Sequence, residues 1–220
     1  RCHEGDTVPE ASLLSAGRAL MDRAGCYGCH KVDGHEDWES EAPDLNGLAQ
    51  KTSATWLRAW LRAPRDLQPG TWMPDFRLAD EEIEALVHFL WSQPPTPSQN
   101  LGPGGDPLRG DPERGKILFS ESRCISCHTV EGKGNGSAPE LSRIGSKVDR
   151  RWLVAYVGNP EAFQPGTRMP RYHFSRQDLL DLTDYMMEEF ADSPAPAPAP
   201  PLRPAQKAVQ AGEEIYGKYG

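Results

Sequence analysis

The chain has 220 residues, 37% of them hydrophobic, and its formal net charge is −8 at pH 7. Its longest apolar stretches, residues 83–91 and 152–157, are far shorter than the ~20 residues of a membrane-spanning helix, so no membrane anchor is visible in this segment. The acidic balance argues against nucleic acid as a partner, because phosphate binding needs a basic face.

Most of the chain consists of one module that occurs twice. The segment 26–30 aligns with 124–128 at an offset of 98 residues. After a two-residue indel the offset is 96, and it then holds to the end of the module, for example at Met73 and Met169. A constant offset over so many positions predicts two domains of the same fold.

Three helices are expected in each module, in the same order. In module 1 they are residues 13–24, a helix with Trp56 and Trp60 on one face, and a helix with an apolar stripe over residues 83–91. Their counterparts in module 2 are residues 114–121, the helix of Trp152 and Tyr156, and residues 179–190. No alternating strand pattern is convincing, so the expected fold class is all-α, with two tandem small helical domains joined by Pro/Gly-rich linkers.

The expected division of the chain is the tail of an upstream segment (1–11), module 1 (12–93), a linker (94–113), module 2 (114–190), a Pro-rich linker (191–206) and the start of a further module (207–220). The alternating Pro and Ala residues of 194–201 favour polyproline II, which would hold neighbouring domains at a semi-rigid distance. At fewer than ~80 residues, each module is marginal on its own hydrophobic core. Another group is therefore expected to fill its middle.

Four of the five cysteines lie in two Cys-x-x-Cys-His strings, residues 26–30 and 124–128. This string is typical of the attachment site of c-type haem. Two thiols three positions apart can each form a thioether with one haem vinyl group, and the following histidine then lies under the iron. The strings predict haem c held covalently by Cys26, Cys29, Cys124 and Cys127, with His30 and His128 as iron ligands.

Other uses of these cysteines fit less well. A four-cysteine zinc site would need its two Cys-x-x-Cys strings about 15–20 residues apart, whereas Cys29 and Cys124 are 95 apart. A thioredoxin-like redox pair needs a βαβ context, which the pattern lacks. A disulfide inside each string would leave the histidines and the repeat unexplained.

These features together resemble the class I cytochrome c family. The resemblance covers about 155 of the 220 residues and rests on the two strings, a Met-Pro pair after a Pro-Gly-Thr loop in each module, and a glycine followed by a large residue four positions later. It implies that the first and last helices of each module cross at Gly17 with Phe89 and at Gly115 with Tyr185. Met21 stands where the family has an aromatic residue, so a looser contact is expected in module 1.

The resemblance also implies the second axial ligand of each iron, which is a methionine at a similar distance after the histidine in both modules. Met73 lies 43 residues after His30, and Met169 lies 41 after His128, in matching loops flanked by prolines. A thioether is a soft donor that suits haem iron, and His/Met ligation raises the potential. The alternative is that both methionines only pack. His35, His88, His173, Met186 and Met187 are assigned to solvent, capping or core positions instead.

The two ends of the chain resemble pieces of further modules. Cys2 and His3 match the second half of another haem string, in which Cys2 would attach the haem covalently and His3 would be an axial iron ligand. The alternatives are an ordinary dipeptide or a lipid-bearing cysteine. Gly212 and Tyr216 copy the opening of a module, and a cysteine is expected just after Gly220. We therefore expect the polypeptide to continue past both ends, with a further haem at each.

Charge is distributed unevenly between the modules. Residues 17–93 hold 13 acidic and 8 basic side chains, including an acidic run over 33–44, whereas residues 114–190 hold 10 acidic and 11 basic ones. Two ordinary solvated surfaces would explain this difference. The alternative is different docking partners, with a basic redox partner at module 1, because complementary charge sets encounter rates.

The sequence predicts a multihaem electron carrier rather than an enzyme. Its expected partners are redox proteins, such as a basic cytochrome or a membrane oxidoreductase complex, and the resemblance implies a periplasmic or otherwise extracytoplasmic location. A dihaem peroxidase is a second class, but it needs an iron with an open coordination site. A cytochrome subunit docked in a respiratory or photosynthetic complex, or a haem-based gas sensor, are further alternatives.

Overall fold

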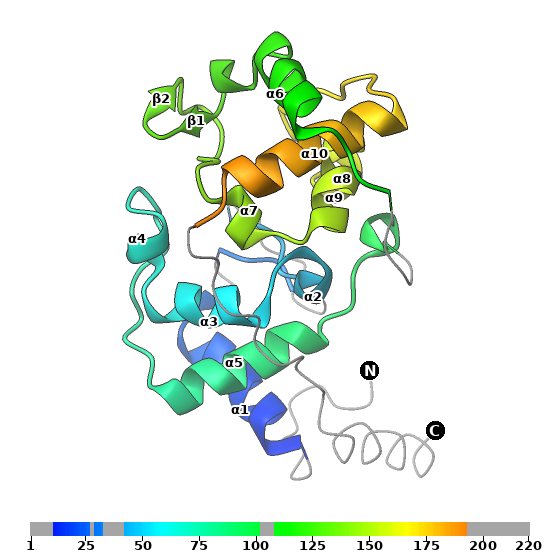
Figure 1. Cartoon of the computed structure of the whole chain (residues 1–220). Helices are drawn as coiled ribbons and strands as arrows, with labels where there is room; N and C mark the ends of the chain where they lie inside the picture. Colours follow the sequence, from blue (N-terminus) through cyan, green and yellow to red (C-terminus); the bar gives the residue numbers. More distant parts are fainter. Residues whose placement is uncertain (1–10, 27–28, 33–41, 102–107, 193–220) are drawn as a thin grey trace. The chain divides into compact units, whose positions relative to one another are not determined.

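The computed structural model describes residues 11–26, 29–32, 42–101 and 108–192 (Figure 1). This part divides into two compact units, one of residues up to 49 with 54–94, and one of residues 50–53 with 95–192. Helices dominate both, which confirms the all-α class. Among the described residues, no helix combines the length and the apolar character needed to cross a membrane. The expectations for Cys2, His3, the acidic residues 33–41, most of the Pro-rich linker and the last module start lie outside the described residues.

The first unit is built on two long helices joined by shorter ones. Its helices are α1 (Ser12–Arg23), α3 (Ala54–Arg62), α4 (Pro64–Leu67) and α5 (Asp80–Ser92), while α2 (Leu48–Lys51) spans the boundary between the units. The stripe predicted on the last helix is confirmed, because Ile83, Leu86, Val87 and Leu90 are all buried on α5. This face and leucines of α1 and α3 form an almost entirely aliphatic core.

The second unit repeats the order of these helices and has further short elements. Its elements are η3 (Pro97–Gln99), α6 (Pro112–Glu121), η4 (Cys124–Ser126), β1 (Thr129–Val130), β2 (Lys133–Gly134), α7 (Ile144–Lys147), α8 (Arg150–Gly158), α9 (Pro160–Phe163) and α10 (Arg176–Glu189). The antiparallel pair β1–β2, with Thr129 opposite Gly134, was not expected from the sequence. The core of the second unit contains more aromatic rings than that of the first unit, since Phe119 packs against both Tyr185 and Phe190.

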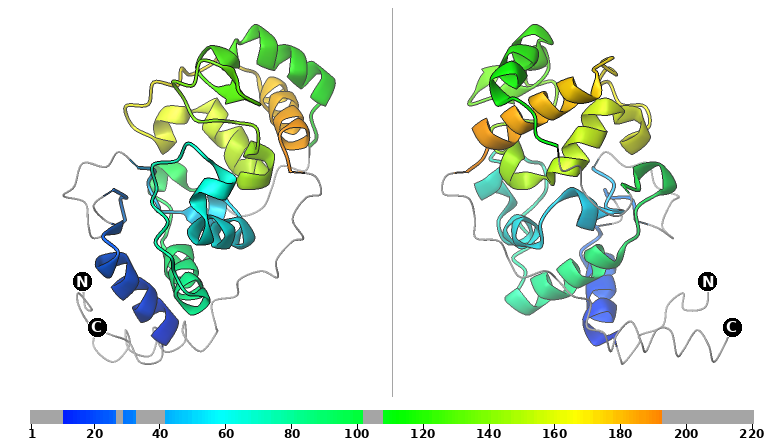
Figure 2. Two further views of the ribbon diagram at one scale, coloured as in Figure 1. Left: turned by 90° about the vertical axis from the view of Figure 1, so that its left-hand side faces the viewer. Right: turned by 45° about the vertical axis from the view of Figure 1, so that its right-hand side comes forward.

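The first and last helices of each unit cross (Figures 1 and 2), and a glycine lies at each crossing. A Cβ added to Gly17 would collide with the carbonyl oxygen of Ala85 and lie 2.7 Å from Cβ of Phe89. At Gly115 it would collide with the carbonyl oxygen of Asp181. The two crossings are equally close and Met21 is only 1% exposed, so the looser contact expected in module 1 is wrong. Met is flexible enough to fill an irregular gap that an aromatic ring fills elsewhere.

A buried ionic cluster distinguishes the second unit. Asp181 and Asp184 of α10 are almost fully buried, and they accept hydrogen bonds from the backbone N–H groups of Asp111 and Gly110. Asp184 also pairs with Arg150, which donates to the carbonyl oxygen of Leu108 at 2.9 Å. The segment before α6 is thereby fixed to α10. The matching positions of α5 in module 1 are Ala85 and His88, which cannot make this cluster.

The acidic groups of this cluster titrate below their ordinary range. Burial raises the pKa of Asp184, but the hydrogen bonds from Arg150 and from the Gly110 N–H group lower it by more, so the pKa of the folded state lies below that of the unfolded chain. The same holds for the pKa of Asp181. Their stabilisation is therefore complete above the unfolded pKa of ~3.9 and is lost as the pH falls through the lower folded value.

Replacing Gly17 by Ala should destabilise module 1 by about 1–3 kcal/mol, because the added methyl group overpacks the crossing of α1 and α5. Chemical unfolding followed by far-UV circular dichroism measures this. Gly70→Ala is the matched control, since a Cβ there meets no atom within 4 Å. Equal effects of the two substitutions would contradict the tight crossing.

Replacing Asp184 by Asn should cost module 2 roughly 3 kcal/mol, because it leaves the guanidinium of Arg150 without its buried counter-charge. The free energy of unfolding of the wild-type protein should fall as the pH drops below ~4, and this fall should be smaller in the variant. Urea unfolding at several pH values gives both quantities. Glu188→Gln, at an exposed position of the same helix, serves as the control and should change neither.

Candidate haem sites

Each Cys-x-x-Cys-His string forms one tight turn directly after the first helix of its unit. The carbonyl oxygen of Cys26 accepts hydrogen bonds from the N–H groups of Cys29 at 3.1 Å and His30 at 2.9 Å. The Cys124 carbonyl accepts the equivalent bond from His128 at 3.0 Å. This turn brings the histidine back beside the first cysteine, as attachment to a single planar group requires.

The four described cysteines form no disulfide. Among the described residues, no group of three or more His, Cys, Asp or Glu side chains is arranged to hold a metal ion. Cys29 and Cys127 are exposed, whereas Cys26 and Cys124 are half-buried. Burial raises the pKa of Cys26, and it raises the pKa of Cys124 to about 11. Both half-buried thiols are therefore protonated at neutral pH.

A backbone carbonyl orients each histidine ring. The Nδ1 atom of His30 lies 2.7 Å from the carbonyl oxygen of Pro43, and that of His128 lies 2.6 Å from the carbonyl oxygen of Pro139. A carbonyl oxygen can only accept, so Nδ1 carries the proton in this contact. The lone pair of the neutral ring is then on Nε2, which is the atom available to a metal.

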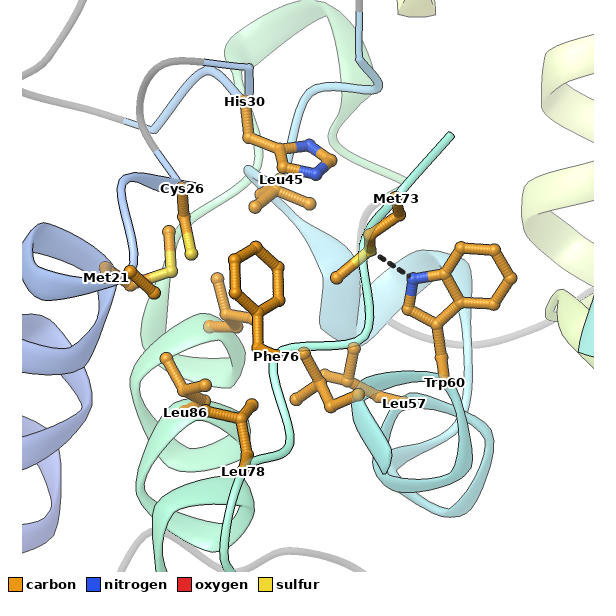
Figure 3. A pocket seen from close by; sticks show the side chains of 13 residues that line it. Met21, Cys26, His30, Leu45, Leu57, Trp60, Met73, Phe76, Leu78 and Leu86 are labelled. Atoms are coloured by element: carbon orange, nitrogen blue, oxygen red, sulfur yellow. Dashed lines mark hydrogen bonds between the residues drawn. The ribbon is translucent and has the colours of Figure 1, made fainter. Parts of the chain in front are cut away.

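An apolar cavity lies in the first unit beside His30. Cys26, His30 and Met73 all line it, and they come from the string and from the loop before α5 (Figure 3). The rest of its wall is mostly aliphatic and aromatic: Met21, Ala24, Leu45, Leu57, Trp60, Leu61, Phe76, Leu78, Leu86 and Leu90.

The methionine loop has the same local structure in both modules. The N–H group of Met73 donates to Oγ1 of Thr71 at 3.2 Å, and Met169 makes the same bond with Thr167 at 3.2 Å. The threonine of the Pro-Gly-Thr motif therefore fixes the turn that presents the methionine. Met73 packs on the core of the first unit and Met169 on that of the second, together with Cys124.

The sulfur of Met73 also receives a hydrogen bond. Nε1 of Trp60 lies 2.9 Å from Sδ of Met73 (Figure 3). Trp60 stacks on Trp56 one turn earlier on α3, with ring centroids 5.0 Å apart. The sequence places both rings on one helix face, but which of them reaches the methionine depends on how α3 lies against the cavity. The pair Trp152 and Tyr156 stacks in the same way in module 2, at 4.7 Å.

The donors around the cavity fit a haem of the c type. The wall supplies apolar contacts for the ring, Cys26 supplies a thiol, and His30 and Met73 supply one nitrogen and one sulfur donor. The remaining candidates have other surroundings. Met186 is buried in the core of the second unit, as expected, whereas Met187, expected at the surface, packs partly buried against that core; His88 lies on α5 near Glu84.

Two small helical units that each carry such a string define a tandem c-type cytochrome. A family model described as cytochrome c matches residues 14–94 and 112–189, which is more than half of the chain. The chain therefore belongs to the cytochrome c family, whose cofactor is haem c and whose activity is electron transfer. This confirms the resemblance drawn from the sequence.

Three relatives illustrate its range of similarity. Cytochrome c oxidase subunit 2 of Alkalihalophilus pseudofirmus is 25% identical in an alignment 210 residues long, which covers 84% of this chain and 55% of that protein. A nitric oxide reductase subunit of Stutzerimonas stutzeri is 30% identical over 79 residues, 33% of this chain and 54% of that protein. Cytochrome c of Arabidopsis thaliana is 32% identical over 104 residues, 37% of this chain and 92% of that protein. The chain thus spans about half the length of the oxidase and reductase proteins.

Proposed function

We propose that this chain carries electrons through two covalently attached haems, one in each module. In module 1 Cys26 and Cys29 would hold the haem, with His30 and Met73 as axial ligands. In module 2 the same roles would fall to Cys124, Cys127, His128 and Met169. The observation that carries the proposal is the convergence of Cys26, His30 and Met73 on one apolar cavity.

The residues around the cavity suit a carrier. Haem, when bound, supplies an iron that alternates between its ferric and ferrous states. The aliphatic wall excludes water and lowers the local dielectric, and the Pro43 carbonyl holds His30 in one orientation. A methionine in both modules argues against a peroxidase, because such an enzyme needs a free coordination position.

The wider setting of this activity is also part of the proposal. Two of the similar proteins are named as parts of an oxidase and of a nitric oxide reductase, which supports work within a respiratory electron-transport complex in an extracytoplasmic compartment. The acidic balance of module 1 favours a basic partner there. Further haems at the chain ends, with Cys2 and His3 at one of them, remain a prediction.

Haem should stay with the polypeptide during denaturing electrophoresis and should resist extraction into acid–acetone. Replacing Cys26 and Cys29 together by Ala should remove one haem per chain, as should the same change at Cys124 and Cys127. Haem staining combined with intact mass counts them. Ser126→Ala, inside a string but with no thiol, is the control and should lose none. Complete release of haem from the wild-type chain would refute covalent attachment.

Met73→His and Met169→His should each remove one haem's share of the weak long-wavelength band that sulfur–iron(III) bonds give, and each should lower one midpoint potential. Absorption spectra of the oxidised protein and a redox titration measure both effects. Met187→Leu is the control, because Met187 packs in the core of the second unit and is not a proposed ligand. If the long-wavelength band kept its full intensity in both Met73→His and Met169→His, these methionines would not be the ligands.

A further inference from the structure

The loop that follows the β1–β2 hairpin carries an Asn-Gly pair at the surface of the second unit (Figure 1). Asn135 and Gly136 are both exposed, as is every residue from 131 to 137. Gly136 has a φ of +77°, and a Cβ built on it would have Cγ2 of Thr129, 3.8 Å away, as its nearest neighbour. The space around the pair is therefore open to water.

An exposed Asn-Gly pair is chemically labile, because glycine has no side chain to hinder an attack on the asparagine before it. The main-chain nitrogen of Gly136 forms a bond with Cγ of Asn135, and the Cγ–Nδ2 bond breaks. Ammonia leaves with the proton that the Gly136 N–H group has lost, and a succinimide ring remains. Water then opens this ring at one of its two carbonyl carbons, which gives aspartate or isoaspartate. Both products add a negative charge, and isoaspartate also inserts one CH2 group into the main chain.

A second Asn-Gly pair, in the first unit, is protected by the fold. Gly47 is buried, and its N–H group donates to the carbonyl oxygen of Gln93 at 3.3 Å. The nitrogen that would attack Asn46 is thus engaged and shielded. The other two asparagines of the chain precede a leucine, whose side chain hinders the attack, and a proline, which has no N–H group. Deamidation is therefore expected first at Asn135.

The loop with the exposed pair is held on the haem string of module 2. The N–H group of Asn135 donates to the carbonyl oxygen of Ile125 at 3.2 Å, and that of Ala138 donates to the carbonyl oxygen of Cys127 at 2.9 Å. Both acceptors lie within the string. Isoaspartate at position 135 lengthens the main chain between these two donors, so the two hydrogen bonds can no longer both keep their present geometry.

We propose that Asn135 deamidates spontaneously in the folded protein, and that isoaspartate at this position loosens the support of His128. Pro139, the residue after Ala138, places its carbonyl oxygen 2.6 Å from Nδ1 of His128. A shift of Ala138 therefore moves the group that orients the ring of the proposed iron ligand. The reaction itself needs no haem, so the inference goes beyond the proposed function.

The first test follows peptide masses while the full-length holoprotein is incubated at mildly alkaline pH. Trypsin separates the two pairs, because it cleaves after Lys133 and Arg143 on either side of Asn135. Asn135 should gain one dalton steadily, whereas Asn46 should react at least about tenfold more slowly, since its buried site must first open. Asn135→Gln keeps an amide but needs a larger ring, so it should block the reaction.

Incubation in urea provides the reference, because both pairs should react at similar rates in the unfolded chain. Equal rates at the two pairs in the folded protein would overturn the inference. So would a rate at Asn135 that lies far below its rate in urea, because the fold would then protect this pair as well.

Hydrogen exchange of the aged protein tests the consequence for the loop. The amide of Ala138 should exchange faster in isoaspartyl chains than in fresh protein, because its bond to Cys127 is weakened. Asn135→Asp is the matched control, since it adds the same charge without lengthening the main chain, and it should keep the protection of fresh protein. Unchanged protection in isoaspartyl chains, or an equal loss in Asn135→Asp, would contradict the loosened support. Release of haem or a missing sulfur–iron band would bear on the proposed function alone.

Discussion

Each unit depends on the close crossing of its first and last helices at one glycine. Gly17 lets the backbone of α1 touch α5, and any Cβ there would collide with the carbonyl oxygen of Ala85. The crossing has two consequences for the site. It fixes the end of α1, from which the turn of Cys26 starts, and it brings Leu86 and Leu90 of α5 into the cavity wall. A displacement of this crossing would separate the thiol from the wall.

A backbone carbonyl group and a threonine side chain then fix the donors around the cavity. The Pro43 carbonyl oxygen holds the ring of His30, and Thr71 holds the turn that presents Met73. The same two contacts occur in module 2, with Pro139 and Thr167, although many of the surrounding side chains differ. What the modules share is therefore the geometry of histidine and methionine presentation. In the proposed function, such preorganisation would spare the protein from reordering these side chains when the charge on a bound iron changes.

Around this shared frame the modules have diverged in polarity. The core of module 1 is almost entirely aliphatic, and beside it the indole N–H group of Trp60 donates to the sulfur atom of Met73. Module 2 has clustered rings and a buried pair of Asp184 with Arg150 that holds the preceding segment. Buried ionic groups contribute little net stability but fix one arrangement, since any other would leave a buried charge unpaired. The ion pairs of module 1, such as Arg58 with Glu84, are more exposed, so a largely buried ion pair is a feature of module 2 among the described residues.

The sequence by itself determined the repeat, the all-α class, the attachment strings and the apolar stripe of the last helix, because these depend on spacing within one segment. The tertiary structure decided what depends on contacts between segments. The two strands of the β1–β2 hairpin are too short to show an alternating hydrophobic pattern in the sequence. The tight packing of Met21 depends on the flexibility of its side chain in a gap formed by two helices. Trp56 and Trp60 are equivalent in the helical pattern, yet only the placement of α3 beside the methionine loop directs the N–H group of Trp60 to Met73. A hydrogen bond between residues 13 apart needs an angle and a distance that no sequence period encodes.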